Sequence, residues 1–190
     1  MRTGNLFIIS GPSGAGKGTL VKELVSVVPD LWVSVSVTTR APRPGEVEGQ
    51  HYFFVGESEF RSLIDTGGLL ECAEVHGNCY GTPRAAVEAK VALGRQVVLE
   101  IDPQGALQVK ALRPESILIF IMPPSWEELE RRLEGRGSET KAQVVRRLET
   151  AKREYELVGE YKHVVQNDDV LRAVGELVGI IDSYADQQKV

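Results

Sequence analysis

Three short apolar runs along the chain are each followed by a segment in which apolar residues recur at helical spacing. The first run, at 6–9, passes through a glycine-rich loop into a helical pattern between 20 and 28, and runs at 97–101 and 116–121 precede similar patterns. Apolar runs of this length are typical of buried strands, and their alternation with helices predicts a parallel sheet covered on both faces. We therefore expect an α/β core.

The pattern changes between residues 34 and 83, where short apolar segments such as HYFFV alternate with prolines and glycines. Frequent turn residues between short apolar segments predict a small β-rich insertion. At 190 residues the chain is only slightly longer than an average domain of ~150 residues. We expect a single domain, with a core formed by 1–35, 85–125 and 147–190 and an inserted subdomain at 36–84.

A second change comes at 131–140, RRLEGRGSET, where glycines and arginines separate two helical patterns. The first of these patterns begins with Ser125 and Glu128 at the spacing of a capping box. We interpret the segment as a mobile flap and assign a helical lid to 126–146. Beyond it the pattern predicts amphipathic helices at 141–155 and from 168 onward, on either side of a short strand at 163–166.

Charge and composition restrict the partners that such a fold could have. The net charge is −5 and the isoelectric point about 5.3, which argues against a nucleic-acid sheath or a polybasic membrane contact. No apolar run approaches the roughly 20 residues of a membrane-spanning helix, and the opening MRTGNLFIIS is too short for a signal peptide. We expect a cytoplasmic protein whose anionic ligands are small.

The loop after the first apolar run carries the strongest chemical signal. GPSGAGK, from Gly11 to Lys17, has two glycines five residues apart followed by lysine, between a predicted strand and a predicted helix. Its glycines allow the backbone N–H groups to turn inward, and the helix dipole and the lysine attract phosphates; the alternative is a glycine-rich turn without a ligand. The candidate ATP-binding residues here are Gly11, Pro12, Ser13, Gly14, Ala15, Gly16, Lys17, Gly18 and Thr19.

The residue after this lysine bears on the metal. A serine or threonine is usual there and contacts Mg²⁺, whereas this chain has Gly18 followed by Thr19. The ending GKGT resembles nucleoside monophosphate kinases, in which Mg²⁺ keeps several waters and is carried by the nucleotide phosphates. We predict Mg²⁺ as cofactor with no direct protein ligand, while Glu100 or Asp102 could hold metal-bound water.

A second anion site is predicted in TTRAPRPGE, at 38–46, where a stiff proline-rich turn holds Arg40 and Arg43. Arginine suits bidentate capture of phosphate. The alternative is a solvated basic loop. The phosphate loop earlier in the chain, together with Tyr52 and Tyr80 downstream, favours a binding site.

The motifs GPSGAGKGT, SVTTRAPRPGE, GQHYFF, ECAEVHGNCYGT, LEIDPQGA, LEGRG and QNDD, in this order, resemble the guanylate kinase family over nearly the whole chain. The resemblance implies a P-loop NTPase three-layer core with a parallel sheet, a GMP-binding insertion and a helical lid. It also implies Mg²⁺-dependent transfer of the γ-phosphoryl group of ATP to GMP, giving ADP and GDP, in purine nucleotide metabolism and GMP recycling. ATP and GMP are the expected partners, with dGMP as a further acceptor.

The resemblance also implies roles for individual residues at the acceptor site. The acceptor phosphate is expected to be held by Arg40, Arg43, Tyr52 and Tyr80. The guanine edge is expected to be read by Ser36, Glu71, Thr82 and Asp102. Guanine offers N1–H and a 2-amino group as donors and O6 as an acceptor, so carboxylates and hydroxyls are suitable partners. Thr82 and Asp102 each precede a proline and could also cap helices.

For phosphoryl transfer, the resemblance implies that Lys17 acts together with the lid arginines Arg132, Arg136 and Arg147. Arginines on a closing flap neutralise charge on the transferring group. The alternative is a salt bridge on the helix surface for Arg147 and a solvated face for Arg131 and Arg132, and we adopt the solvated face for Arg131. Asn167 matches the family segment that lines the adenine end of the ATP site.

Two other functions fit the same fold. A guanylate-kinase-like interaction module would hold a phosphorylated partner, but such modules lose the phosphate loop that is intact here. A kinase for a ribose phosphate would have no use for the predicted base-reading residues. The two cysteines, Cys72 and Cys79, have no second Cys/His pair to complete a zinc site, and we expect both to be reduced thiols.

Overall fold

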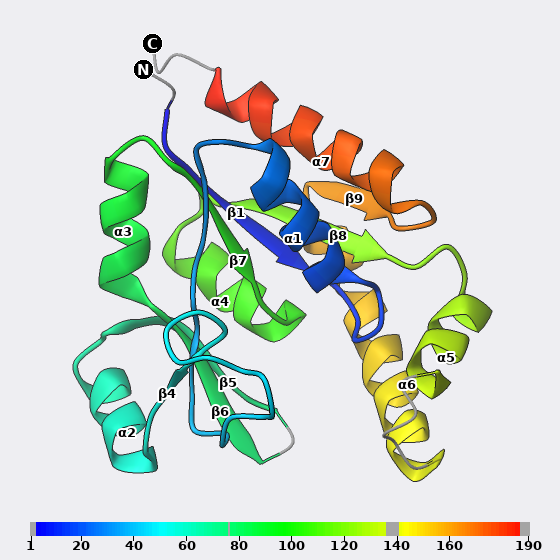
Figure 1. Ribbon diagram of the computed structural model, residues 1–190, viewed down its shortest axis with the longest axis horizontal. Helices are drawn as coiled ribbons and strands as arrows, with labels where there is room; N and C mark the ends of the chain where they lie inside the picture. Colours follow the sequence, from blue (N-terminus) through cyan, green and yellow to red (C-terminus); the bar gives the residue numbers. More distant parts are fainter. Residues whose placement is uncertain (1–2, 76, 136–140, 187–190) are drawn as a thin grey trace.

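The computed structural model describes residues 3–75, 77–135 and 141–186. Its centre is a parallel sheet in the order β2-β7-β1-β8-β9 (Figure 1), as the alternation of strands and helices predicts. The strands are β1 (Asn5–Ser10), β2 (Leu31–Val33), β7 (Gln96–Glu100), β8 (Ile117–Met122) and β9 (His163–Gln166). The chain therefore has the expected α/β core.

Helices cover both faces of this sheet because alternate strand residues point to opposite sides. From β1, Phe7 and Ile9 pack with α1 (Lys17–Val27) and α7 (Val170–Ala185). Leu6 and Ile8 belong to the cluster on the other face, with α3 (Arg84–Ala92) and α4 (Pro103–Leu112). The result is the three-layer arrangement in Figure 1.

The inserted segment forms a second sheet in the order β4-β3-β6-β5. Its strands are β3 (Val37–Thr38), β4 (Phe53–Phe54), β5 (Leu69–Val75) and β6 (Asn78–Pro83). The β-rich prediction was incomplete, because α2 (Glu57–Asp65) lies between β4 and β5 and buries Phe60 against Val37 and Leu69. This small cluster gives the second sheet an apolar core of its own.

The segment predicted as a lid begins with α5 (Trp126–Glu134), and α6 (Lys141–Glu156) follows, in agreement with the helix expected at 141–155. The Ser125 hydroxyl accepts the Glu128 N–H at 3.2 Å, so the serine half of the predicted capping box is formed, while the Glu128 carboxylate bonds Arg131 and Arg132. Leu129 and Leu133 pack against Val144 in a separate cluster. Residues 136–140 of the expected flap lie outside the described residues.

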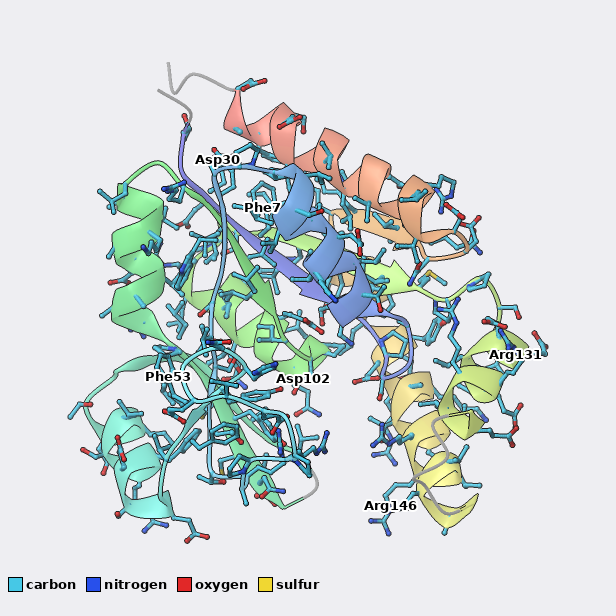
Figure 2. The ribbon with its side chains drawn as sticks, in the orientation of Figure 1. Phe7, Asp30, Phe53, Asp102, Arg131 and Arg146 are labelled. Atoms are coloured by element: carbon cyan, nitrogen blue, oxygen red, sulfur yellow. The ribbon has the colours of Figure 1, made fainter. Side chains whose placement is uncertain are left out.

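A short 3₁₀ helix (Val158–Glu160) leads from α6 into β9. Figure 1 shows the second sheet and the α5–α6 pair on opposite sides of the molecule, both beyond the end of the core sheet where β1 terminates. Asp102 lies where the core meets the second sheet (Figure 2). No helix in the described ranges is long and apolar enough to span a bilayer.

Candidate active site

A cleft of about 350 Å³ opens at the carboxyl ends of β1 and β7. Ligands of open α/β sheets bind at this edge. Three regions line it: the phosphate loop and the end of β7, the second sheet, and one face of α6. The predicted site residues in its wall are Gly11, Ser13, Lys17, Ser36, Arg43, Tyr52, Glu71, Tyr80, Asp102 and Arg147.

The loop from Gly11 to Lys17 has the geometry of a phosphate cradle. Three glycines of the loop have positive φ values, which residues other than glycine rarely adopt: 139° at Gly11, 92° at Gly14 and 90° at Gly16. Lys17 begins α1, and its Nζ donates to the carbonyl of Gly11 at 2.5 Å and to that of Pro12 at 3.2 Å. The lysine is thus folded back along its own loop, with its charge facing the cleft.

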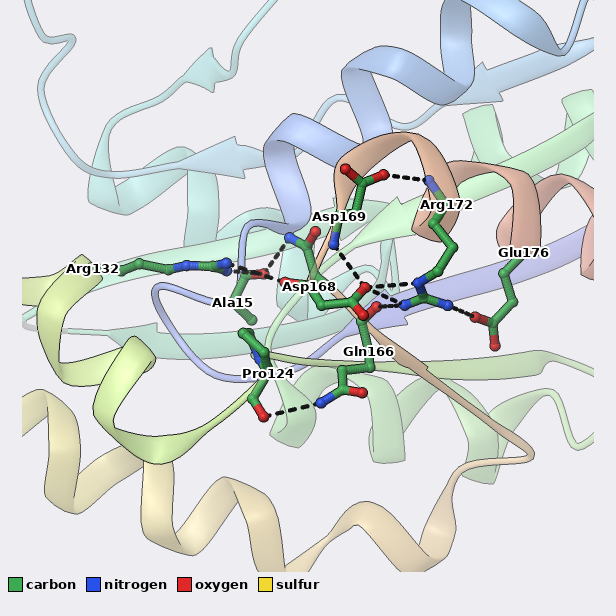
Figure 3. A network of polar contacts seen from close by, with 9 residues as sticks. Ala15, Pro124, Arg132, Gln166, Asp168, Asp169, Arg172 and Glu176 are labelled. Atoms are coloured by element: carbon green, nitrogen blue, oxygen red, sulfur yellow. Dashed lines mark hydrogen bonds and ion pairs between the residues drawn. The ribbon is translucent and has the colours of Figure 1, made fainter.

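Asn167 supports this loop from behind and is 4% exposed. Its Nδ2 donates to the carbonyl of Ala15 at 2.7 Å, and a Cβ at Gly16 would stand 2.3 Å from the same nitrogen. The residue that sequence reasoning assigned to the adenine end therefore contacts the phosphate loop directly. Arg172 in turn braces the segment before it, through Asp168 and the carbonyl of Gln166 (Figure 3).

Arg132 reaches the same loop from α5. Its guanidinium donates to the carbonyl of Asn167 at 3.1 Å and to that of Ala15 at 3.4 Å (Figure 3). Its Nε donates to Glu128 at 2.7 Å. Arg131, one residue earlier, is exposed and pairs with Glu128, as expected for a solvated face. Helix α5 thus presents one arginine to the phosphate loop and one to solvent.

Arg147 approaches from α6, and a terminal nitrogen donates to the Ser13 hydroxyl at 3.0 Å. Thr150 and Glu154 line the cleft from the same helix, three and seven residues further along. That spacing returns to one helical face. Arg136, the third predicted lid arginine, lies outside the described residues.

Opposite the phosphate loop, Arg40 is held on several sides. Its Nε donates to the Tyr80 hydroxyl at 3.2 Å, a terminal nitrogen meets Glu46 at 2.8 Å, and the guanidinium lies 5.4 Å from the Tyr52 ring centroid. The other Glu46 oxygen accepts the Arg43 N–H at 2.7 Å. The hydrogen bond from Arg40 lowers the pKa of Glu46 to about 2, so the pair is ionised at neutral pH. Glu46 lies within the TTRAPRPGE motif, but its position in the sequence alone does not indicate this role.

Glu71 on β5 is 6% exposed, and the Thr82 hydroxyl donates to its Oε1 at 2.6 Å. Burial raises the pKa of Glu71 to about 7, with the Asp102 charge adding to the effect and the Thr82 bond opposing it. The expected additional capping role of Thr82 is wrong: it belongs to β6, and the N-cap of α3 is Pro83, without a side-chain bond. Asp102 does cap α4, accepting the Gly105 N–H at 2.8 Å.

Glu154 is a cleft residue that sequence reasoning missed. Burial raises its pKa to about 7, and the nearby Lys17 opposes that rise. Within the described part of the chain its Oε2 is buried without a hydrogen-bond partner. Its position two helical turns after Arg147 was the signal available in the sequence. In residues 3–75, 77–135 and 141–186 no group of three His, Cys, Asp or Glu could hold a metal.

Comparison with known proteins fits this geometry. The family model described as guanylate kinase matches residues 3–184. A guanylate kinase of Desulfitobacterium hafniense is 51% identical over 178 residues, covering 94% of this chain and 89% of that relative. One of Synechococcus sp. is 52% identical over 170 residues, covering 90% of each. The crystal structure of guanylate kinase from Anaplasma phagocytophilum superposes with a TM-score of 0.83 at 34% identity, over 99% of this chain and 89% of that one.

Proposed function

This chain belongs to the guanylate kinase family, a group of nucleoside monophosphate kinases, and we propose how its cleft binds ATP and GMP and transfers phosphate between them. The activity is that of an ATP:GMP phosphotransferase. The observation that carries the residue assignment is one cleft with the phosphate-loop lysine on one side and an arginine–tyrosine cluster with two carboxylates on the other.

At the ATP end, the phosphate loop from Gly11 to Thr19 cradles the β and γ phosphates with its N–H groups, and Lys17 supplies a positive charge. The present bonds of Lys17 to carbonyls of its own loop hold the ammonium group at this position. Asn167 acts by fixing the loop, since its amide nitrogen bonds the carbonyl of Ala15.

At the GMP end, Arg40, Arg43, Tyr52 and Tyr80 bind the acceptor phosphate. Arg40 is already oriented by Tyr80 and Glu46, which reduces the conformational entropy that phosphate binding would cost. The acceptor is a phosphate oxygen that is ionised at neutral pH, so the reaction requires no general base. The site's task is to place that oxygen in line with the γ-phosphate.

Ser36, Glu71, Thr82 and Asp102 read the base. Glu71 and Asp102 accept from the N1–H and the 2-amino group of guanine, and hydroxyls serve O6. Adenine has neither donor, and a buried Glu71 would then lack its partners. Sites built on such pairing discriminate by factors of roughly 10⁴ to 10⁵. The deoxyribose of dGMP does not enter this recognition, so dGMP is a second acceptor.

During transfer, Arg132 and Arg147 neutralise charge that spreads over the moving phosphoryl group, with Arg136 as a further contributor from the lid. Both described arginines reach the phosphate loop, through Ala15 and Ser13 respectively. Arginines in this role are worth roughly 10³ to 10⁵ in rate in related systems.

Mg²⁺ would be carried mainly by the nucleotide phosphates. A Cβ at Gly18 would lie 3.5 Å from a Glu100 oxygen, so the missing side chain leaves space between α1 and this carboxylate. Glu100 and Asp102 both line the cleft and would hold water bound to the ion. The chemistry that Mg²⁺ would supply there is neutralisation of charge on the nucleotide phosphates.

We further propose that the subdomain at 36–84 and the lid at 126–146 close on the core when both nucleotides bind, which excludes water as a competing acceptor. Each contains an apolar cluster, around Phe60 in the subdomain and around Leu129 in the lid, and the cluster of the lid continues along α6 to Ala151. Small-angle scattering should show a smaller radius of gyration with both nucleotides than without them, and an unchanged value would contradict closure. The cytoplasm and purine nucleotide metabolism, including GMP recycling, are the proposed setting.

The assay that tests the function couples ADP release to ATP, Mg²⁺ and, in turn, GMP, dGMP, AMP, CMP, UMP and ribose phosphates. We expect strong preference for GMP. Lys17→Ala should lower kcat by roughly 10³-fold or more while thermal unfolding is little changed, because the lysine acts on charge in transfer. Lys22→Ala, on the exposed side of the same helix, is the matched control and should keep full activity. Absence of turnover with every acceptor would favour the interaction-module alternative.

A further inference from the structure

Gly105, in the first turn of α4, lies between the Glu71 and Asp102 carboxylates, both of which line the cleft. Its N–H donates to Asp102 Oδ1 at 2.8 Å. A Cβ built on Gly105 would stand 2.6 Å from Glu71 Oε2 and 3.1 Å from Glu71 Cδ. Since real Cβ atoms essentially never approach a heavy atom within 3.0 Å, the Glu71 carboxylate occupies the space that any side chain at 105 would fill.

The backbone itself does not require glycine at this position. Gly105 is absent from the set of described glycines with positive φ and sits within a regular helix. Glycine is among the poorest helix formers, so its presence inside the first turn works against the helix. The close contact with Glu71 is the feature of the structure that explains it.

Glu71 cannot move aside without losing other contacts. Its Oε1 accepts from the Thr82 hydroxyl at 2.6 Å, and the residue is 6% exposed. The strand that carries it is also fixed to α4: the Gln108 side chain accepts the Cys72 N–H at 3.1 Å and donates to the Cys72 carbonyl at 2.9 Å. Helix and strand are therefore joined at the residue next to Glu71, and a larger residue at 105 would have to push the carboxylate.

We propose that Gly105 is a positioning residue for acceptor recognition, which sets the separation and direction of the Glu71 and Asp102 carboxylates and thereby the preference for a purine with two donors on one edge. The N–H of Gly105 fixes one carboxylate, and its missing side chain admits the other. This inference rests on the proposed base-reading role of the two acids. It adds that Gly105, which does not itself contact the base, determines where their carboxylates lie.

The test compares Gly105→Ala with Gly175→Ala. Gly175 is a glycine inside α7 with nothing within 4 Å of a built Cβ, so both substitutions improve helix propensity equally and only one meets a carboxylate. Gly175→Ala should leave all kinetic constants unchanged. Gly105→Ala should lower kcat/KM for GMP by about 10²-fold, as expected for a misplaced recognition group, and lower the GMP-to-AMP preference, with KM for ATP unchanged.

A second measurement separates positioning from a structural role, even if Gly105→Ala folds poorly. Truncating the carboxylate removes the clash, so Glu71→Ala/Gly105→Ala should unfold at the same temperature as Glu71→Ala alone or above it. An equal drop in Tm in both backgrounds would overturn the proposal, as would an unchanged GMP-to-AMP ratio in Gly105→Ala. If the wild-type protein itself shows no preference for GMP, the proposed function fails; if it does and Gly105→Ala keeps it, only this inference fails.

Discussion

The Glu71 carboxyl group titrates in the range where the protein is expected to work. Its pKa of about 7 results from burial and from the Asp102 charge. Only the ionised form presents two acceptor oxygens to guanine, because a protonated carboxyl carries a hydrogen of its own. Recognition of GMP should therefore depend on pH through this one group.

We expect kcat/KM for GMP to fall up to tenfold for each pH unit below about 7, as Glu71 takes up its proton. The profile should be measured from pH 5.5 to 8.5 at saturating ATP. The phosphate of GMP also titrates, near pH 6. Glu71→Gln should have lower activity at every pH, and its profile should show the titration of the GMP phosphate alone. A wild-type profile with the same shape as that of the variant would contradict the role of Glu71 in the pH dependence.

Glu46 and Glu154 show which single positions cannot be assigned a role from the sequence. Glu46 stood inside the motif that identified Arg40 and Arg43, but its two bonds to them depend on how the 40–46 turn folds. Glu154 carries no motif of its own, and its helical spacing from Arg147 gains meaning only because α6 passes beside the phosphate loop. Residues recognised by their own chemistry were predictable, whereas residues that act through tertiary placement were not.

Among the structural elements, the phosphate loop depends on a contact from the distant end of β9. Asn167 donates from a buried position to the carbonyl of Ala15, and Arg132 approaches the same carbonyl. The loop is thus held in its curled form by residues more than 100 positions further along the chain. Without the Asn167 amide, the glycines would still allow the curled conformation, but the loop would lose the buried donor that supports it.

Asn167→Ala should destabilise the protein by about 1 to 3 kcal/mol, because the carbonyl of Ala15 loses a buried donor. KM for ATP should rise while KM for GMP stays constant, since the acceptor site does not touch this residue. Gln166→Ala is the matched control: its amide bonds the carbonyl of Pro124 at an exposed position and should cost less than ~0.5 kcal/mol. Chemical unfolding measures the change in stability, and steady-state kinetics measure the two KM values. Equal effects of the two variants would refute the supporting role of Asn167.

The helices and strands were largely predictable where the spacing of apolar residues and the capping residues indicated the same element. The buried strands and the Ser125 cap follow from short-range pattern and are present in the structure. Helix α2 was missed because it has nine residues between glycine-rich turns and buries only Phe60. Thr82 was misjudged because β6 continues through Pro83, so a pairing with β5 decides its partner rather than the helix that follows.

At the scale of the whole molecule, the raised pKa values of Glu71 and Glu154 favour the folded state at low pH. Recognition of GMP has the opposite pH dependence, because it needs Glu71 ionised. Glu71 and Glu154 each have a pKa of about 7 in the folded protein, against an ordinary value of 4.5. Their contribution to stability is fully present below about pH 4.5 and is lost as the pH rises through about 7. Carboxylates with lowered pKa values, such as Glu46 and Glu128, act oppositely but only below about pH 4.5.

The ligand-free protein should consequently lose roughly 5 kcal/mol of unfolding free energy between pH 5 and pH 8, about half of it from each carboxyl group. Glu154→Gln should reduce this loss, because an amide keeps the shape but does not ionise. Urea unfolding at pH 5, 6.5 and 8 checks the slope. A variant that tracks the wild type at all three values would show that Glu154 is solvated in the free protein.

The pairing of β1 with β7 joins segments that are far apart in the sequence, since Asn5 lies opposite Gln96, 91 positions later. The whole second sheet is made between them. At a ribosomal rate of roughly 5 to 20 residues per second, the apolar β1 strand waits on the order of 5 to 20 s for its first neighbour. During that interval Phe7, Ile8 and Ile9, which end fully buried, have no sheet to enter. The nascent chain is therefore most in need of chaperone protection before its catalytic loop has any partner to hold it.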